Sequence, residues 1–256
     1  MTDLRRAITR SMRLMPVLAF LCQGTMASAS TFTVSRVNVL LTARQKSELV
    51  TVKSSSDATL RFQVSVFAWD QNPQGEMALT PTRDIVFFPP LFSLKPGEER
   101  SLRIGTATPA GTVEKTYRLF IEELPRQEGG SGPPGQVAIR TRLGIPIFLR
   151  PLKEVTAGRV DQVEVRDGRL AFAVRNTGNV HFLVQTIRMT GYDAAGEAVL
   201  EGKLDGWYVL AGGTRLHDLE LPVDKCHLLK KVSIEIQTPQ AAFSERLDLT
   251  TVGCRP

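Results

Sequence analysis

Three kinds of residue in this 256-residue chain could carry chemistry: histidines, cysteines and neighbouring carboxylates. The histidines, His181, His217 and His227, do not stand at the spacing of metal ligands. Glu122 and Glu123 are adjacent, and adjacent residues of a strand point to opposite faces, so they cannot act as a carboxylate pair. We therefore expect no metal, no cofactor, and histidines that pack or lie on the surface.

Sequence motifs for catalysis and for nucleic-acid binding are also missing. The chain has no G-x-S-x-G nucleophile turn and no glycine-rich phosphate loop. Its basic residues form no cluster interleaved with stacking aromatics, which argues against nucleic acid as a partner. The sequence thus predicts a protein that is not an enzyme and has no small-molecule substrate.

Residues 1–29 have the layout of a secretory signal peptide. A basic start is followed by the apolar run Leu14–Leu21 and by the small residues Ala27–Ala29. The apolar run is shorter than the ~20 residues that span a bilayer, although a membrane anchor or a lipid on Cys22 remains an alternative. Removing this leader lowers the net charge from +6 to +3, because it holds four basic residues and one acidic residue.

Two cysteines, Cys226 and Cys254, remain after the leader. An even number in an exported protein indicates one disulfide, and the alternative is two separate buried thiols. The bond would close a loop of about 29 residues, which the chain-entropy model values at about 3.5 kcal/mol.

The chain after the leader predicts strands almost throughout. Apolar and polar residues alternate strictly in many short runs, for example over 60–68, 116–121, 170–174 and 232–236. Turn signals separate the runs, and Asp167-Gly168 predicts a tight hairpin. Many short strands at close spacing are typical of β-sandwiches.

A boundary between two sandwiches follows the longest alternating strand, 137–149. Pro151 cannot donate a ladder hydrogen bond and ends this strand, so we expect domains at 30–150 and 152–256. The Gly- and Pro-rich segment 126–136 that precedes the strand predicts a mobile loop.

Several segments resemble one family. The run FFPPLFSLKPGEERSLRIG, residues 87–105, resembles the PP-x-F-x-L-x-PG-x-x-x-x-x-R signature of periplasmic pilus chaperones of the chaperone–usher pathway. Residues 114–125 and 140–151 resemble the last two strands of their first domain, and residues 169–191 resemble their second-domain pattern with its N-x-G-N step. This PapD-like resemblance implies an all-β protein of two immunoglobulin-like sandwiches in an L shape, in the periplasm. Pilus subunits and an outer-membrane usher are its implied partners.

The resemblance also implies a mechanism, donor-strand complementation. A pilus subunit lacks the final strand of its immunoglobulin-like fold, and the chaperone inserts the last strand of its own first domain into the gap. The implied subunit-binding residues are Val137, Ile139, Thr141 and Leu143, whose alternative is to face only the chaperone's own core. An apolar edge strand is an aggregation hazard unless something binds there.

The better-studied branch of the family binds the subunit's C-terminal carboxylate through a first-strand arginine and a last-strand lysine. Here the lysine position falls on Pro146 and the arginine position on Asn38 or, with a small gap, on Arg36. Pro146 and the segment 69–71 resemble the archaic branch of the family. The candidates for a carboxylate anchor are, in order, Arg36, Arg142 and Arg118, because a guanidinium pairs bidentately with a carboxylate. The alternative for each is a solvated arginine.

A pair of residues between the domains is implied as well. Glu114 and Arg150 match the family's interdomain glutamate and arginine, whereas Pro239 falls near its second-domain aspartate, so we expect a reduced, structural network. Two other functions remain open: a subunit of a surface fibre, and a secreted enzyme on a sandwich scaffold.

Overall fold

The computed structural model describes residues 32–125, 140–249 and 253–254 of the chain. Nearly all of these residues lie in or between strands, and α1 (Val223–Cys226) is the one helix among them. The all-β prediction is therefore confirmed. No helix in this part of the chain is long and apolar enough to cross a membrane.

Several predicted features fall outside the described residues. They are the leader 1–29, the Gly- and Pro-rich segment 126–136, and the first two donor-strand residues, Val137 and Ile139.

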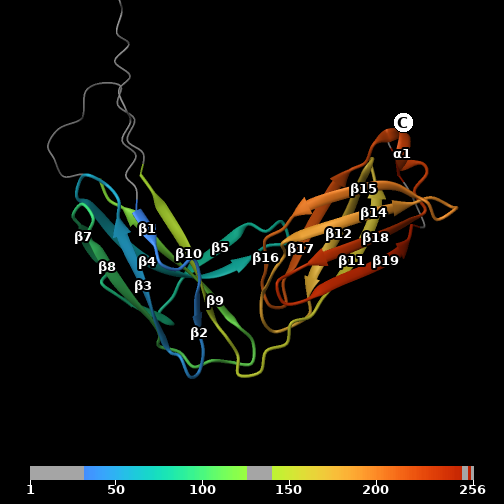
Figure 1. Ribbon diagram of the computed structural model, residues 1–256. Coiled ribbons are helices and arrows are strands. Elements are labelled where there is room, and N and C mark those ends of the chain that lie inside the picture. The colour runs from blue at the N-terminus through green and yellow to red at the C-terminus, as the bar shows by residue number, and fades with distance from the viewer. Residues whose placement is uncertain (1–31, 126–139, 250–252, 255–256) are drawn as a thin grey trace, which may run out of the picture.

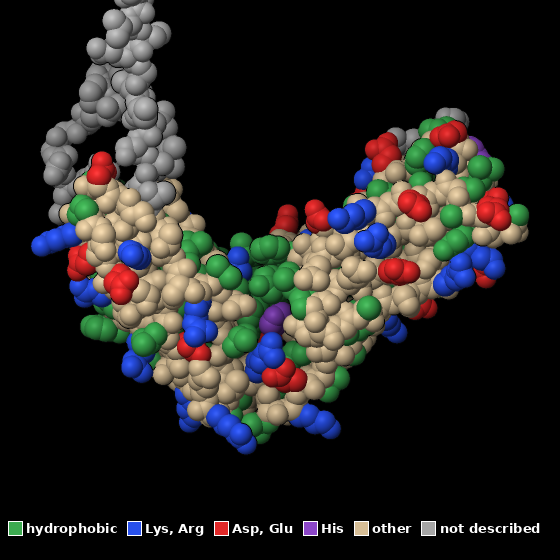
Figure 2. Space-filling model, in the orientation of Figure 1, with side chains coloured by type: hydrophobic (Ala, Val, Ile, Leu, Met, Phe, Trp, Pro, Cys, Tyr) green, Lys and Arg blue, Asp and Glu red, His purple; other side chains and the backbone are tan. Residues whose placement is uncertain are grey.

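Two sandwiches form the arms of a V, as the predicted L shape requires (Figure 1). Figure 2 shows the hollow between the arms, with hydrophobic side chains gathered where the arms meet. We call this hollow the cleft.

The first domain packs two sheets face to face. One has the strand order β1-β3-β8-β6, and the other, which we call the cleft sheet, has the order β2-β10-β9-β4-β5, with β7 also paired to β4. The strands are β1 (Phe32–Val34), β2 (Val39–Leu41), β3 (Ser47–Ser54), β4 (Leu60–Gln71), β5 (Met77–Pro81), β6 (Ile85–Phe88), β7 (Leu91–Leu94), β8 (Glu99–Thr106), β9 (Lys115–Glu123) and β10 (Arg142–Leu149).

Alternation of side chains explains this packing. In β4 the apolar residues Leu60, Phe62 and Val64 are buried, whereas Gln63 between them is exposed. Phe62 contributes to a core that also receives Val50 from the opposite sheet. One face of each sheet thus packs against the opposite sheet, as expected when side chains alternate between the two faces of a strand.

The second domain has three groups of strands. The first has the order β11-β12-β17, the second is the pair β13-β16, and the third has the order β15-β14-β18-β19. The strands are β11 (Gly158–Arg166), β12 (Arg169–Asn176), β13 (Phe182–Leu183), β14 (Thr186–Tyr192), β15 (Ala198–Asp205), β16 (Tyr208–Val209), β17 (Thr214–Glu220), β18 (Lys231–Gln237) and β19 (Ala242–Asp248).

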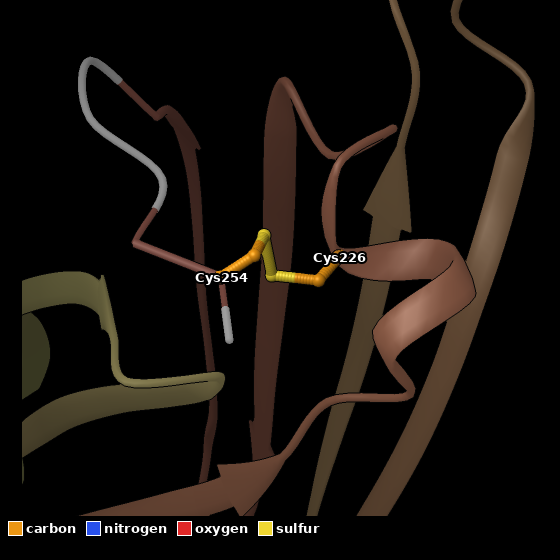
Figure 3. The surroundings of a disulfide bond; sticks show 2 residues. All are labelled: Cys226 and Cys254. Atoms are coloured by element: carbon orange, nitrogen blue, oxygen red, sulfur yellow. A yellow bond between two sulfur atoms is a disulfide. The ribbon is translucent and has the colours of Figure 1, made fainter. Parts of the chain in front are cut away.

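Two local features of the second domain match sequence signals. Asp167 and Gly168 both have positive φ, 53° and 70°, and join β11 to β12 as the predicted tight hairpin. Cys226 in α1 and Cys254 near the end of the chain are joined by a disulfide, with 5.8 Å between their Cα atoms (Figure 3). The bond ties the end of the chain to the helix.

Candidate functional site

Strand β10 has one edge that is only partly covered. Strand β9 pairs with it over its whole length, Arg142–Leu149, but β2 pairs with its other edge only at Ile147–Leu149. Within the described residues, the stretch 142–146 therefore has no strand partner on that side.

The backbone groups at this open edge follow from the alternation of a strand. The amide of Arg150 donates to β2 over 2.9 Å, and the carbonyl of Thr141 accepts from β9 over 3.0 Å. Even-numbered residues hence direct their backbone groups to the β2 side. Arg142 and Gly144 offer both N–H and C=O at the open edge, whereas Pro146 offers only C=O.

The odd-numbered face of β10 is apolar and enters the first-domain core. Ile145 and Ile147 are fully buried there, and Leu143 packs partly buried against the same cluster. Thr141, before the strand, is half-buried. Of the predicted subunit-binding residues, Leu143 thus contacts its own domain, at the point where the apolar face leaves the sandwich.

The even-numbered face of β10 looks into the cleft beside β9. A Cβ at Gly144 would lie 3.2 Å from Arg118 Nε and 3.1 Å from the ring of Phe120. The lack of a Cβ at Gly144 lets these two side chains lie close to the backbone of β10, and a Cβ there would make them give way by a few tenths of an ångström. Arg142 stacks its guanidinium over Phe120, 3.9 Å from the ring centroid.

Arg118 is a buried cation that has no anion beside it in the described part of the chain. Only 9% of the residue is exposed, its guanidinium lies 4.9 Å from the ring centroid of Trp69, and it has no ion pair among the described residues. Its Nε and Nη1 are buried without a hydrogen-bond partner there. Burial lowers the pKa of Arg118, and Tyr208 partly opposes this. Such a group in a folded protein calls for a partner, because an unpaired buried charge is costly.

The other two anchor candidates differ from Arg118 in both respects. Arg36 has 56% of its side chain exposed and lies 3.9 Å from Glu48. Arg142 has 51% exposed and lies 3.6 Å from Glu122. Each is a surface arginine that already has a carboxylate neighbour.

The interdomain residues lie together at the hinge. The Glu114 side chain is fully buried, and its Oε1 accepts from the backbone N–H of His181 at 3.0 Å and lies 2.6 Å from His181 Nδ1. Its Oε2 lies 3.9 Å from Arg150 Nε. Arg150 also pairs with Glu154 in the linker. The carboxylate of Glu114 is therefore held between the two domains.

Sequence reasoning missed His181 and Asn179 in this hinge. The Asn179 amide donates to the carbonyls of Thr112 and Lys153 at 2.8 and 2.9 Å, and its oxygen accepts from Val155 N–H at 2.7 Å. One side chain thus joins the first domain, the linker and the second domain. The available signal was the polar step N-T-G-N-V-H, 176–181, directly before a buried strand.

An aromatic cluster continues the interface into the cleft sheet. Trp69 and Phe148 from the first domain pack against Leu210 and Tyr208 from the second. His181 stacks on Phe148 with 3.6 Å between the ring centroids. Because Phe148 belongs to β10, the second domain touches the same strand whose other end has the open edge.

Metal chemistry finds no support in the described part of the chain, where no three His, Cys, Asp or Glu residues lie together in a group that could hold an ion.

Comparison with known families and structures gives one consistent result. Residues 31–154 match the model of the PapD N-terminal domain, described as a pili and flagellar-assembly chaperone. The chain has no match among curated proteins.

Solved structures share the fold at low identity. A chain of the CsuC–CsuE chaperone–tip adhesion subunit pre-assembly complex, from archaic chaperone–usher Csu pili of Acinetobacter baumannii, is 19% identical with a TM-score of 0.57; the match covers 88% of this chain and 100% of that one. The class 5 fimbriae chaperone CfaA is 14% identical with a TM-score of 0.56, over 87% and 100%. A chain of the Salmonella enterica SafA pilin–SafB chaperone complex is 17% identical with a TM-score of 0.55, over 86% and 98%.

Proposed function

Because this chain is a PapD-like chaperone of the chaperone–usher pathway, we propose that it holds pilus subunits in the periplasm by donor-strand complementation and delivers them to an outer-membrane usher. In this proposal β10 and the residues before it fill the groove of a subunit that lacks one strand. In this proposal the protein acts by binding subunits and performs no catalysis.

The open edge of β10 carries the proposal. Over residues 142–146 this edge lacks a strand partner in the described chain, while the opposite edge is held by β9. A mobile edge would cost ordering entropy on binding, whereas an edge fixed on a sandwich is pre-organised. Backbone groups of Arg142 and Gly144 supply affinity that does not depend on the subunit's side chains.

The apolar face of the same strand supplies the second part of the binding energy. Ile145 and Ile147 anchor it in the first domain, and the alternation continues through Leu143 toward Ile139 and Val137. Each apolar side chain that becomes buried in a subunit contributes roughly 1.5–3 kcal/mol before ordering costs. The chaperone core and the subunit core would then be joined by one continuous strand.

Arg118 is the anchor that we propose for the subunit's C-terminal carboxylate. The sequence ranked it behind Arg36 and Arg142, but it alone among the three is buried and lacks a carboxylate neighbour in the described residues. It also lies next to Gly144 on the donor strand. A carboxylate that pairs bidentately with this guanidinium would satisfy donors that are otherwise unpaired.

Periplasmic co-purification tests the proposal. The full chain carries an affinity tag at its C-terminus, is purified from periplasmic extract, and is analysed by mass spectrometry and native mass measurement. We expect one pilus subunit in a one-to-one complex. Recovery of the chain as a fibre would favour the surface-fibre alternative, and recovery of the monomer with no subunit from piliated cells would contradict the proposal.

A further inference from the structure

The turn between β4 and β5 is built as a rigid unit. The Gly75 N–H donates to the Asn72 carbonyl at 2.8 Å, and the Glu76 N–H donates to Asn72 Oδ1 at 2.9 Å. The Asn72 amide in turn donates to Glu76 Oε2 at 2.7 Å. Gly75 has φ of +82°, which favours glycine. These bonds fix the shape of residues 72–76 without help from the rest of the molecule.

This turn contacts the second domain. Figure 1 shows the β4–β5 hairpin extending from the first domain toward β16 and β17. The Leu216 N–H of β17 donates to the Pro73 carbonyl at 2.8 Å. Strand β17 pairs with β12 on its other side, so Pro73 occupies the edge that the second-domain sheet leaves open.

A close side-chain contact lies beside this hydrogen bond. A Cβ at Gly75 would lie 2.4 Å from the guanidinium carbon of Arg215, so the glycine is packed directly against that group. Burial lowers the pKa of Arg215, and its Nε has no hydrogen-bond partner in the described residues. Any side chain at residue 75 would have to displace the guanidinium.

The turn is a third interdomain contact, separate from the hinge and from the aromatic cluster around Trp69. The hinge joins Glu114 to His181, the turn joins Pro73 to Leu216, and the cluster around Trp69 lies between elements of both domains. A hinge alone allows the domains to rotate about the linker, whereas two separated contacts oppose that rotation. The width of the cleft is then fixed before a subunit arrives.

We propose that residues 72–76 form a strut that sets the opening of the cleft, and that Gly75, Arg215 and Leu216 are positioning residues for subunit capture. The proposal rests on the proposed function for its second half, since the subunit is the ligand that the cleft would receive. Without the strut only a fraction of the molecules would have the receptive opening. If that fraction fell to about a tenth, the apparent affinity would fall about tenfold.

Leu216→Pro removes the hydrogen bond selectively. The Leu216 N–H points away from β12, so proline there keeps the β12–β17 ladder and removes only the donor to Pro73. Asp218→Pro is the matched control, because residue 218 has the same orientation two positions along the same edge. Leu216→Ala keeps the N–H and should behave like the wild type.

A second pair of variants tests the strut from the first domain. Gly75→Ala forces the methyl group against Arg215, whereas Gly97→Ala imposes the same kind of backbone strain, at φ of +73°, with nothing within 4 Å of the new Cβ. Both alanines carry a left-handed backbone penalty, and only the first disturbs the interface. A larger effect for Gly75→Ala would thus be due to the contact with Arg215.

The readouts are the interdomain distance and the affinity for a subunit. Spin labels on cysteines introduced at Glu99 and Glu201, both exposed, give the distance distribution in the free full-length protein. The ligand is the subunit that co-purifies with the wild type, and thermal unfolding of each variant monitors both domains. We expect a broader distribution and about tenfold weaker capture for Leu216→Pro, and a smaller change in the same direction for Gly75→Ala, because the displaced guanidinium is the end of a flexible side chain. The controls should behave like the wild type.

Two results would overturn the strut. One is an unchanged distance distribution in Leu216→Pro, and the other is a broadened distribution with unchanged capture. If the wild type itself captures no subunit, the proposed function fails, while the distance measurement still decides whether the turn sets the cleft.

Discussion

Strands β10 and β17 both have an edge that their own sheet leaves open near the domain interface, and the molecule treats the two edges differently. The edge of β17 is occupied at Leu216 by the β4–β5 turn of the first domain. The edge of β10 has no strand partner over 142–146 in the described chain. Proteins usually cover such edges because they attract other chains. An edge that is left open beside an apolar face and a buried arginine is therefore suited to receive one.

The largest effect on subunit capture should come from a charge on the apolar face of the open strand. Ile139→Asp should abolish subunit capture and leave the chaperone folded, because a carboxylate buried unpaired in a subunit groove costs several kcal/mol. Recovery of the subunit from periplasm measures the effect, and circular dichroism checks the fold. Arg140→Asp is the control, since alternation puts this exposed residue on the opposite face. Normal recovery with Ile139→Asp would refute the assignment of the strand.

Alanine variants of the three candidate arginines test which of them binds the subunit's carboxylate beside the open edge of β10. Arg118→Ala should weaken subunit binding by roughly 2–5 kcal/mol, as expected when one partner of a buried charge pair is removed. Arg36→Ala and Arg142→Ala should each cost under about 0.5 kcal/mol, since both are exposed. Titration of the purified subunit with each variant gives the affinities. If all three variants bind the subunit as tightly as the wild type does, strand addition alone holds the subunit.

Removal of the disulfide tests whether the second domain contributes stability rather than capture. Replacing Cys226 and Cys254 by serine should lower the free energy of unfolding by about 3.5 kcal/mol, because the bond closes a loop with a sequence separation of 28 residues. Urea unfolding measures this, and subunit binding below the transition should be unchanged. Mass measurement after alkylation without reduction should find no free thiol in the mature protein. Alkylation of two thiols would contradict the bond.

The smallest expected effect is the contribution of His217, in β17, to the pH dependence of the free energy of unfolding. Burial, more than the nearby Arg215, lowers the pKa of His217 from 6.5 to about 4. The unfolded chain binds a proton in this window and the folded chain does not, so the free energy of unfolding should fall as pH drops from about 6.5 toward 4. His217→Gln should remove this part of the pH dependence, whereas His227→Gln, at an exposed histidine, should keep it. Urea unfolding at pH 7.5 and 4.5 decides between these outcomes.

The sandwich fold was predictable from the sequence because alternation is a local property. The runs around Leu60–Val64 and Leu170–Val174 show which side chains share a face, and Asp167-Gly168 fixes a turn by its own backbone preference. Alternation over 137–149 likewise predicted a strand, part of which the structure describes as β10, whereas the role of this strand as an open edge was implied by the family resemblance.

The interface was not predictable, because alternation does not reveal what covers a face. Arg118 and Trp69 lie on the cleft side of their strands, and both are buried, with Trp69 packed against Leu210 and Tyr208 of the second domain. His181 is a packing residue, one of the two roles expected of it, but the sequence did not show that its Nδ1 lies against Glu114, 67 residues earlier in the chain. Contacts of this kind depend on the relative placement of two domains, which no local pattern records.

The parallel pairing of β2 with β10 has a consequence for the order in which the protein assembles itself. Val39 pairs with Ile147, more than a hundred residues later in the chain. Because β2 precedes β10 by about a hundred residues, β2 cannot form its pairing until β10 is present, and non-local pairing of this kind is slow to form. The first domain therefore closes with the very strand proposed to receive subunits, so the surface offered to a subunit is completed late in the folding of that domain.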